Sequence, residues 1–164
     1  MQKADIDAFM DNEGLMKLSI CIPDSVVKNT PPPMDIICVI DISGSMGGSA
    51  ACQTDGRTEY EDLGFSLMDL VKYAVKTVIK CMRSTDRISL ILFDDRIEVP
   101  YNFTLLNDAN RNELLKFVDT IKRRGMTNIY DALKKSIDLV MARGSENGKT
   151  QPANDAAVLF FTDG

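Results

Sequence analysis

Residues 36–46, which read IICVIDISGSM, decide the fold of this chain. The apolar run at 36–40 leads directly into Asp41, and a turn with one glycine and two serines follows at once. An unbroken run of this kind is typical of a strand buried on both faces, and such strands occur mainly in parallel sheets covered by helices. We therefore predict a central strand of a parallel sheet, with a polar turn at its carboxyl end.

The rest of the chain alternates between apolar runs and amphipathic segments. Further strands are predicted at 88–93, 97–103 and 156–161. Pro100 places the second of these at an edge, since proline cannot donate a ladder hydrogen bond. Helices are predicted at 65–83, from the cap Asn107 to Gly125, and from Thr127 or Asn128 to Gly144. Strands that alternate with helices imply right-handed crossovers, and thus an α/β fold class: a doubly wound, mostly parallel sheet with helices on both faces.

Two further predictions concern the last helix and the polar segment 46–62. On the last helix, apolar side chains at helical spacing are expected to face the core. They are Ile129, Leu133, Ile137, Val140 and Met141. The polar segment 46–62 is expected to be a long loop, either an insertion or a partner-contacting element, because long loops beside a site are usually functional or mobile.

The N-terminal part of the chain is expected to be an extension that precedes the main domain, and its strand could cover an edge of the sheet. Residues 1–13 are polar and expected to be frayed, while 15–22 are predicted to form a strand. A connector follows, with three consecutive prolines at 31–33 that act as a stiff spacer. We therefore divide the chain into an N-terminal extension, 1–34, with one strand and a Pro-rich connector, and a main domain, 35–164.

Composition and charge exclude several classes of function. The 164 residues carry a net charge of −5, and the only basic cluster, 122–124, is expected to be a solvated helix end, so no nucleic-acid partner is expected. Histidine is absent, which removes His-based triads and His metal ligands. No apolar run is long enough to span a membrane, and the start lacks the apolar region of a signal peptide. The four cysteines form no CxxC pair, and without a signal sequence reduced thiols and a cytoplasmic location are expected.

Aspartates follow three of the predicted strands, at Asp41, Asp94 and Asp163. Ligands of doubly wound sheets bind beyond the carboxyl ends of the strands, where these side chains collect. Ser43 and Ser45 add hydroxyl groups, and oxygen atoms are the ligands that Mg²⁺ prefers. A cation site is therefore expected at this edge of the sheet, with Asp94 either solvated or supporting the site from behind.

The pentapeptide at 41–45, DISGS, resembles the DxSxS signature of von Willebrand factor type A (vWA) domains. Two further parts of that family's pattern follow in order: Thr127 at the start of a helix, and Asp163 in the strand end FFTDG. The resemblance covers roughly residue 35 to the end and implies a Rossmann-like vWA fold with a metal-ion-dependent adhesion site (MIDAS). It also implies further strands and a C-terminal helix beyond Gly164, so the chain is expected to be C-terminally truncated and part of a longer, intracellular protein with further domains.

The resemblance implies a role for each residue of the site. Ser43 and Ser45 would ligate the cation through their hydroxyls, and Thr127 would do so directly or through water. Asp41 and Asp163 would hold the coordinating waters and the serines. Neutral hydroxyls leave the charge of a Mg²⁺ or Mn²⁺ ion poorly cancelled, so a carboxylate from a partner protein would complete the coordination. The implied function is a cation-dependent protein-interaction module without enzymatic activity.

Other interpretations of these residues stay open. A Mg²⁺-dependent hydrolase or phosphoryl-transfer domain would use Asp41 as nucleophile and Asp163 on the metal, although such chemistry commonly places a general acid where Ser43 stands. A structural module with a vestigial site is a third alternative. Taken singly, the serines or Asp163 could be turn residues, and Thr127 could be no more than a helix cap.

Overall fold

The computed structural model describes residues 5–10, 16–21, 31–53, 60–143, 145–146, 149–150 and 154–163. The chain divides into two compact units, Met1–Pro32 and Pro33–Gly164. In the smaller unit, β1 (Asp5–Met10) pairs antiparallel with β2 (Met16–Cys21). The strand predicted at 15–22 is confirmed by β2. The prediction of a frayed start is wrong for β1, because this stretch pairs with β2 through ladder hydrogen bonds.

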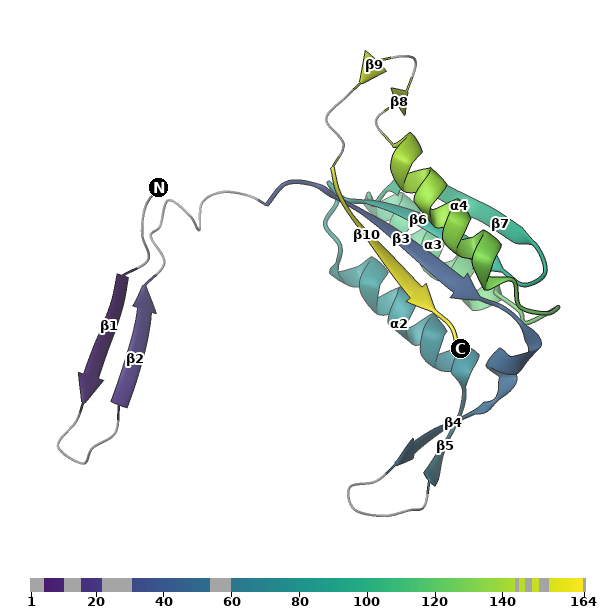
Figure 1. The fold of residues 1–164 in the computed structure, drawn as a ribbon, viewed down its shortest axis with the longest axis horizontal. Helices are drawn as coiled ribbons and strands as arrows, with labels where there is room; N and C mark the ends of the chain where they lie inside the picture. The colour runs from purple at the N-terminus through teal and green to yellow at the C-terminus, as the bar shows by residue number, and fades with distance from the viewer. Residues whose placement is uncertain are drawn as a thin grey trace. The chain divides into compact units, whose positions relative to one another are not determined.

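A four-stranded sheet with the order β10-β3-β6-β7 forms the centre of the larger unit (Figure 1). Its strands are β10 (Asp155–Phe161), β3 (Met34–Asp41), β6 (Arg87–Phe93) and β7 (Ile97–Leu105). The first three run parallel, and β7 pairs antiparallel with β6 at the edge. The predicted α/β fold class, the central strand and the edge position of the Pro100 strand are therefore confirmed.

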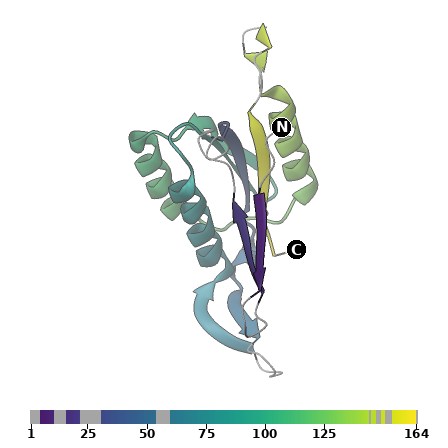
Figure 2. The ribbon, with the colours of Figure 1, turned by 90° about the vertical axis from the view of Figure 1, so that its left-hand side faces the viewer.

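Helices cover both faces of this sheet, as Figure 2 shows. They are α2 (Leu67–Cys81), α3 (Asp108–Thr120) and α4 (Ile129–Ala142). Cys38 and Ile40 of β3 face a core shared with α2 and α3, whereas Ile37 and Val39 face the core under α4. All four side chains are almost fully buried, so the apolar run of β3 serves two cores at once.

The starts of the helices follow local capping chemistry. Ser66 and Asp69 form a capping box at α2, in which each side chain accepts a hydrogen bond from the other's backbone N–H. Asn107 caps α3 as predicted, and Asn128 caps α4. The prediction that α3 reaches Gly125 is wrong, because the chain turns out of the helix at Ile121, whose side chain is buried.

The face that α4 turns to the sheet differs from the prediction. Ala132, Ser136 and Leu139 are the buried residues of this helix. Val140 is partly buried against the core, as expected. The other expected core residues are 38–78% exposed; these are Ile129, Leu133, Ile137 and Met141. The spacing of the apolar residues predicts an apolar stripe, but the side chains that fit against β3 and β6 are the small ones of Ala132 and Ser136.

This orientation of α4 predicts the outcome of a paired substitution. Ala132→Leu should lower the free energy of unfolding by about 1–3 kcal/mol, because it overpacks a position with no exposed surface. Leu133→Ser, one residue on, should change it by no more than about 0.5 kcal/mol, because Leu133 is 47% exposed. Urea unfolding of both variants measures the difference. The opposite ranking would mean that α4 is rotated about its axis.

Part of the predicted loop at 46–62 is a hairpin. A 3-10 turn, η1 (Gly44–Gly47), leads into β4 (Ser49–Gln53), which pairs antiparallel with β5 (Tyr60–Ser66). The loop prediction is wrong for these residues and untested for 54–59, which lie outside the described residues. Residues 49–53 read SAACQ, which lacks strand-forming side chains, so pairing with β5 makes this strand.

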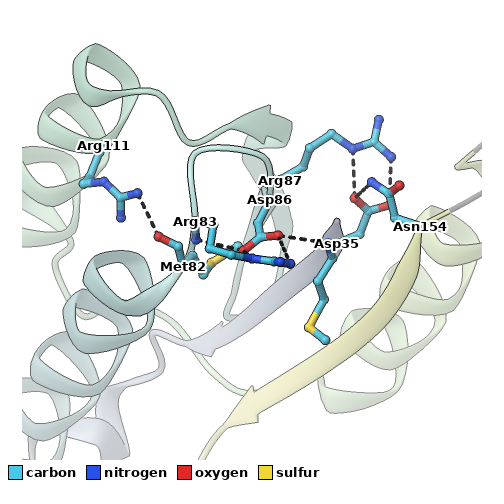
Figure 3. A network of polar contacts seen from close by, with 8 residues as sticks. Asp35, Met82, Arg83, Asp86, Arg87, Arg111 and Asn154 are labelled. Carbon is cyan, nitrogen blue, oxygen red and sulfur yellow. Dashed lines mark hydrogen bonds and ion pairs between the residues drawn. The ribbon is translucent and has the colours of Figure 1, made fainter. Parts of the chain in front are cut away.

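A polar network closes the amino ends of the strands (Figure 3). Arg87 donates from Nε and Nη2 to the two carboxylate oxygens of buried Asp35, at 2.8 and 2.7 Å, and Asn154 Nδ2 donates at 3.0 Å. Asp86 accepts hydrogen bonds from the backbone N–H of Met34 and from Arg83. Every carboxylate in this network has a cationic partner, as buried charges require.

Candidate metal centre

Asp41 ends β3 at the carboxyl edge of the sheet, where β3 and β10 finish side by side (Figure 1). Its side chain is fully buried. The Ser43 backbone N–H donates to Oδ1 at 2.8 Å, and the Thr162 hydroxyl donates to Oδ2 at 2.9 Å. Among the residues that the structure describes, no lysine or arginine forms an ion pair with Asp41. A buried carboxylate without a cation is costly, so this position favours a positive ion nearby.

The hydroxyls of Ser43 and Ser45 come together in the turn after Asp41. Their Oγ atoms lie 3.0 Å apart. Ser43 is buried and Ser45 is exposed, so the pair leads from the buried carboxylate to the surface. Two oxygens bound at right angles to one Mg²⁺, each at 2.0–2.1 Å, are separated by about 2.9 Å. The spacing of the two hydroxyls therefore fits adjacent ligands of an octahedral ion.

The segment before α4 is tied to this turn by backbone hydrogen bonds. The Arg124 N–H donates to the Ile42 carbonyl at 2.7 Å, and the Gly44 N–H donates to the Gly125 carbonyl at 3.2 Å. Thr127, two residues further on, is exposed and makes no hydrogen bond with another described residue. Because Asn128 caps α4, the interpretation of Thr127 as a helix cap is wrong, and its hydroxyl is free for a ligand.

Asp94 is hydrogen-bonded to the same segment, the one that precedes α4. It accepts hydrogen bonds from the Arg96 N–H at 2.7 Å and from Arg124 Nε at 2.8 Å, and its carbonyl accepts from the Asn128 N–H. Burial raises the pKa of Asp94, but these hydrogen bonds and the charge of Arg124 outweigh it, so the pKa lies below its ordinary value of 3.8. Asp94 is buried rather than solvated, and it supports the site from behind.

The sequence pattern pointed to Asp163 as the residue near Asp41, but its neighbour Thr162 makes the contact. Asp163 is exposed, and no hydrogen bond joins it to another described residue. Thr162 is the residue that contacts Asp41. The structure thus brings together Asp41, Ser43 and Thr162, and Asp163 is the next residue after Thr162. The family signature names only the aspartate and therefore gives no role to Thr162. The alternation of side chains along a strand could have pointed to it, because Thr162 and Asp163 are expected to point to opposite sides.

Residues 36–164 match the family model of the von Willebrand factor type A domain. The chain belongs to the vWA family. This vWA domain is 27% identical to inter-alpha-trypsin inhibitor heavy chain H3 from Pongo abelii over 133 residues, which are 80% of the chain and 13% of the relative. A similar match, 27% over 140 residues, covers 82% of the chain and 12% of heavy chain H2 from Mesocricetus auratus. The chain therefore spans only about an eighth of the length of these curated relatives.

A solved structure supports the same fold. The PilB minor pilin from Streptococcus sanguinis matches with a TM-score of 0.61 and 21% identity, covering 92% of this chain and 33% of the pilin. At this identity the similarity shows the fold alone. In the part of the vWA chain that the structure describes, no helix is long and apolar enough to cross a membrane.

The donor set of this vWA domain differs from that of an acid-rich metal site. Among the described residues, no three acidic, cysteine or histidine side chains converge as metal ligands. The candidate centre consists instead of two paired hydroxyls, one buried and one exposed, with one buried carboxylate behind them. Such a set suits a hard cation that keeps waters, and it leaves room for a ligand from outside.

Gly125 gives a specific test of the loop beside the vWA site. Its φ is +68°, and a Cβ there would lie 2.4 Å from Asp95 Oδ1 and 3.0 Å from Asp94 Cβ. Gly64 has nearly the same φ, +71°, but a Cβ there would meet no atom within 4 Å, so Gly64→Ala is a matched control. The control should cost about 1–2 kcal/mol of unfolding free energy. Gly125→Ala should cost more in urea unfolding; equal costs would mean that the loop yields without strain.

Proposed function

We propose that this vWA domain binds a partner protein through a divalent cation, with a carboxylate of the partner completing the coordination. The metal-site residues are Asp41, Ser43, Ser45, Thr127 and Asp163. One observation carries the proposal: a fully buried carboxylate, which has no counter-charge among the described residues, lies behind two hydroxyls that are 3.0 Å apart. Proteins of this family mediate protein interactions, which agrees with an external ligand.

In this proposal each of the five residues has its own role. Ser43 and Ser45 hold the ion directly, and Thr127 adds a hydroxyl from the neighbouring segment. Asp41 orients the turn through the Ser43 N–H and supplies charge from behind, while Asp163 holds coordinating water. Mg²⁺ or Mn²⁺ suits these oxygens and supplies a positive charge that neutral hydroxyls do not cancel. An acidic side chain of a partner is the natural remaining ligand.

Binding is a better account of this geometry than catalysis. As a nucleophile, Asp41 would need an oxygen that a substrate can reach. Both of its carboxylate oxygens accept hydrogen bonds, and the side chain has no exposed surface. A phosphoryl-transfer or hydrolase function therefore lacks an accessible nucleophile at this position.

The experiment that tests the proposal follows Mn²⁺ by the relaxation rate of water protons, which reports bound Mn²⁺ with water ligands. The wild type should enhance relaxation, and Ser43→Ala and Ser45→Ala should weaken Mn²⁺ binding by about 10–100-fold. Ser84→Ala, an exposed serine outside the site, is the matched control and should bind as the wild type does.

The same signal tests for the external carboxylate. A short peptide with one glutamate should displace water from the bound ion and lower the enhancement, whereas its glutamine counterpart should not. Mn²⁺ binding that Ser45→Ala leaves unchanged would overturn the site. Absence of any Mn²⁺ binding by the folded domain would favour the interpretation of a vestigial site.

A cytoplasmic location stays a prediction that rests on the thiols. Cys38 and Cys81 are free, and burial raises the pKa of Cys38 to about 12, which keeps that thiol protonated. We propose that the chain works in a reducing compartment. Mass spectrometry after alkylation of the protein from its native source, without reductant, should find these cysteines unpaired.

A further inference from the structure

A polar pocket of about 520 Å³ lies between the amino end of α2 and the segment after α3. Ser66, Asp69 and Lys72 of the α2 region line one side, and Ile121, Lys122 and Arg123 line the other. The basic residues at 122–123 were expected to be a solvated helix end, but α3 ends at Thr120. They belong instead to the irregular segment that leads toward the metal-site turn.

The charge in this pocket is opposite to that of the whole chain. Three cationic side chains and one carboxylate line the pocket, whereas the chain carries a net charge of −5. Among the described residues, neither Lys122 nor Arg123 has an ion-pair partner. Hydrogen bonds from Ser66, followed by the charges of Lys72 and Arg123, lower the pKa of Asp69, so the cations act on a carboxylate already in the pocket.

The pocket is joined to the metal-site turn by direct packing. The guanidinium of Arg123 lies against Gly47, where a Cβ would be only 1.4 Å from Nη1. Gly47 belongs to η1, the same turn that carries Ser45. The next two residues after Arg123 form the backbone hydrogen bonds to Ile42 and Gly44. One short segment therefore lines the pocket and supports the paired hydroxyls.

We infer that this pocket receives a second acidic group of the partner, so that the partner presents an acidic peptide segment rather than a lone carboxylate. This inference rests on the proposed function for the first of the two acidic groups. Lys122 and Arg123 form no ion pair within the described part of the chain, and such cations favour a carboxylate from outside. The negative net charge disfavours long polyanions such as nucleic acid, which leaves a short acidic segment as the fitting ligand.

The test measures fluorescence anisotropy of two labelled peptides, hexaglutamate and a peptide with a single glutamate, in Mg²⁺ and in EDTA. Lys122→Ser/Arg123→Ser should weaken hexaglutamate binding by about tenfold and leave single-glutamate binding unchanged. In EDTA the wild type should keep the part of hexaglutamate binding that the pocket supplies, and the double variant should lose it. Gly47→Ala should weaken the EDTA-resistant part as well, because the methyl group displaces Arg123 without changing any charge.

The matched control is Lys116→Ser/Lys134→Ser, which removes the same charge from exposed lysines of α3 and α4. It should bind hexaglutamate within about twofold of the wild type. Equal binding to the wild type and the pocket variant overturns the pocket, with or without Mg²⁺. If the pocket variant binds hexaglutamate more weakly than the wild type, but Mg²⁺ and EDTA give the same binding, the pocket is upheld and the metal site is overturned. Stronger competition by inorganic pyrophosphate than by unlabelled hexaglutamate would replace the acidic peptide with a phosphate ligand.

Discussion

Arg87→Leu should lower the free energy of unfolding of the vWA domain by about 3–5 kcal/mol. Arg87 makes two hydrogen bonds to Asp35, whose side chain has no exposed surface. Among the described residues, removal of the guanidinium leaves the buried carboxylate with the amide of Asn154 as its remaining hydrogen-bonding side chain. Arg87 also lies over the ring of Phe103 at 5.2 Å, so a cation–π contact is lost with it. Urea unfolding at pH 7 measures the loss.

A second substitution separates charge from packing at this site. Arg87→Leu/Asp35→Asn should be more stable than Arg87→Leu alone, because no unpaired charge remains. Arg96→Leu removes an exposed arginine that is 3.7 Å from Asp95, and it should change stability by no more than about 0.5 kcal/mol. Similar losses for Arg96→Leu and Arg87→Leu would contradict the special role of the buried pair.

Acid should reduce the difference between the wild type and Arg87→Leu. Burial raises the pKa of Asp35, but the hydrogen bonds from Arg87 and Asn154 and the charges of Arg87 and Arg143 lower it below 3.8. In the wild type the contribution of Asp35 to stability is therefore present above pH 3.8 and is lost as the pH falls through the folded pKa. In the variant, acid neutralises the unpaired carboxylate and relieves its cost. A constant difference across this range would argue against an electrostatic origin.

Mg²⁺ at a hundredfold excess over its dissociation constant should raise the free energy of unfolding of the wild type by about 2.7 kcal/mol. Asp41→Asn should abolish this response. In EDTA the same variant should be at least as stable as the wild type, because the amide keeps the shape of the carboxylate and removes a buried charge that no described lysine or arginine neutralises. Unfolding by urea in Mg²⁺ and in EDTA provides all four values.

Asp138→Asn is the control for this experiment, since Asp138 is an exposed aspartate of α4 outside the site. It should keep the full Mg²⁺ response. A response that survives in Asp41→Asn would place the cation elsewhere. Lower stability of Asp41→Asn in EDTA would mean that the carboxylate stabilises the turn by itself and needs no ion.

Buried carboxylates at the two ends of the sheet differ in whether a cationic side chain neutralises them. At the amino end, Asp35 is neutralised by Arg87 and Asp86 by Arg83 (Figure 3). At the carboxyl end, Asp94 is paired with Arg124, but Asp41 has no such partner among the described residues. Because a domain built for stability alone has no reason to leave one charge uncompensated, Asp41 is the residue at which we expect function.

The sequence alone determined the features that depend on local patterns. An apolar run long enough for a strand buried on two faces located β3, and alternating elements implied the α/β sheet that the structure has. Asn107 was found as a cap because capping acts between residues three apart. The short spacing of Ser43 and Ser45 likewise placed both hydroxyls in one turn.

Tertiary structure alone decided which side chains meet. The contact of Thr162 with Asp41, the support of Asp94 beneath the loop and the packing of Arg123 on Gly47 all join residues far apart in the chain. The inner face of α4 was also settled in this way, since its apolar stripe is exposed while Ala132 and Ser136 are buried. Local spacing specifies the shape and periodicity of an element, whereas the partner of each side chain is set by the fit and hydrogen bonding of the elements packed around it.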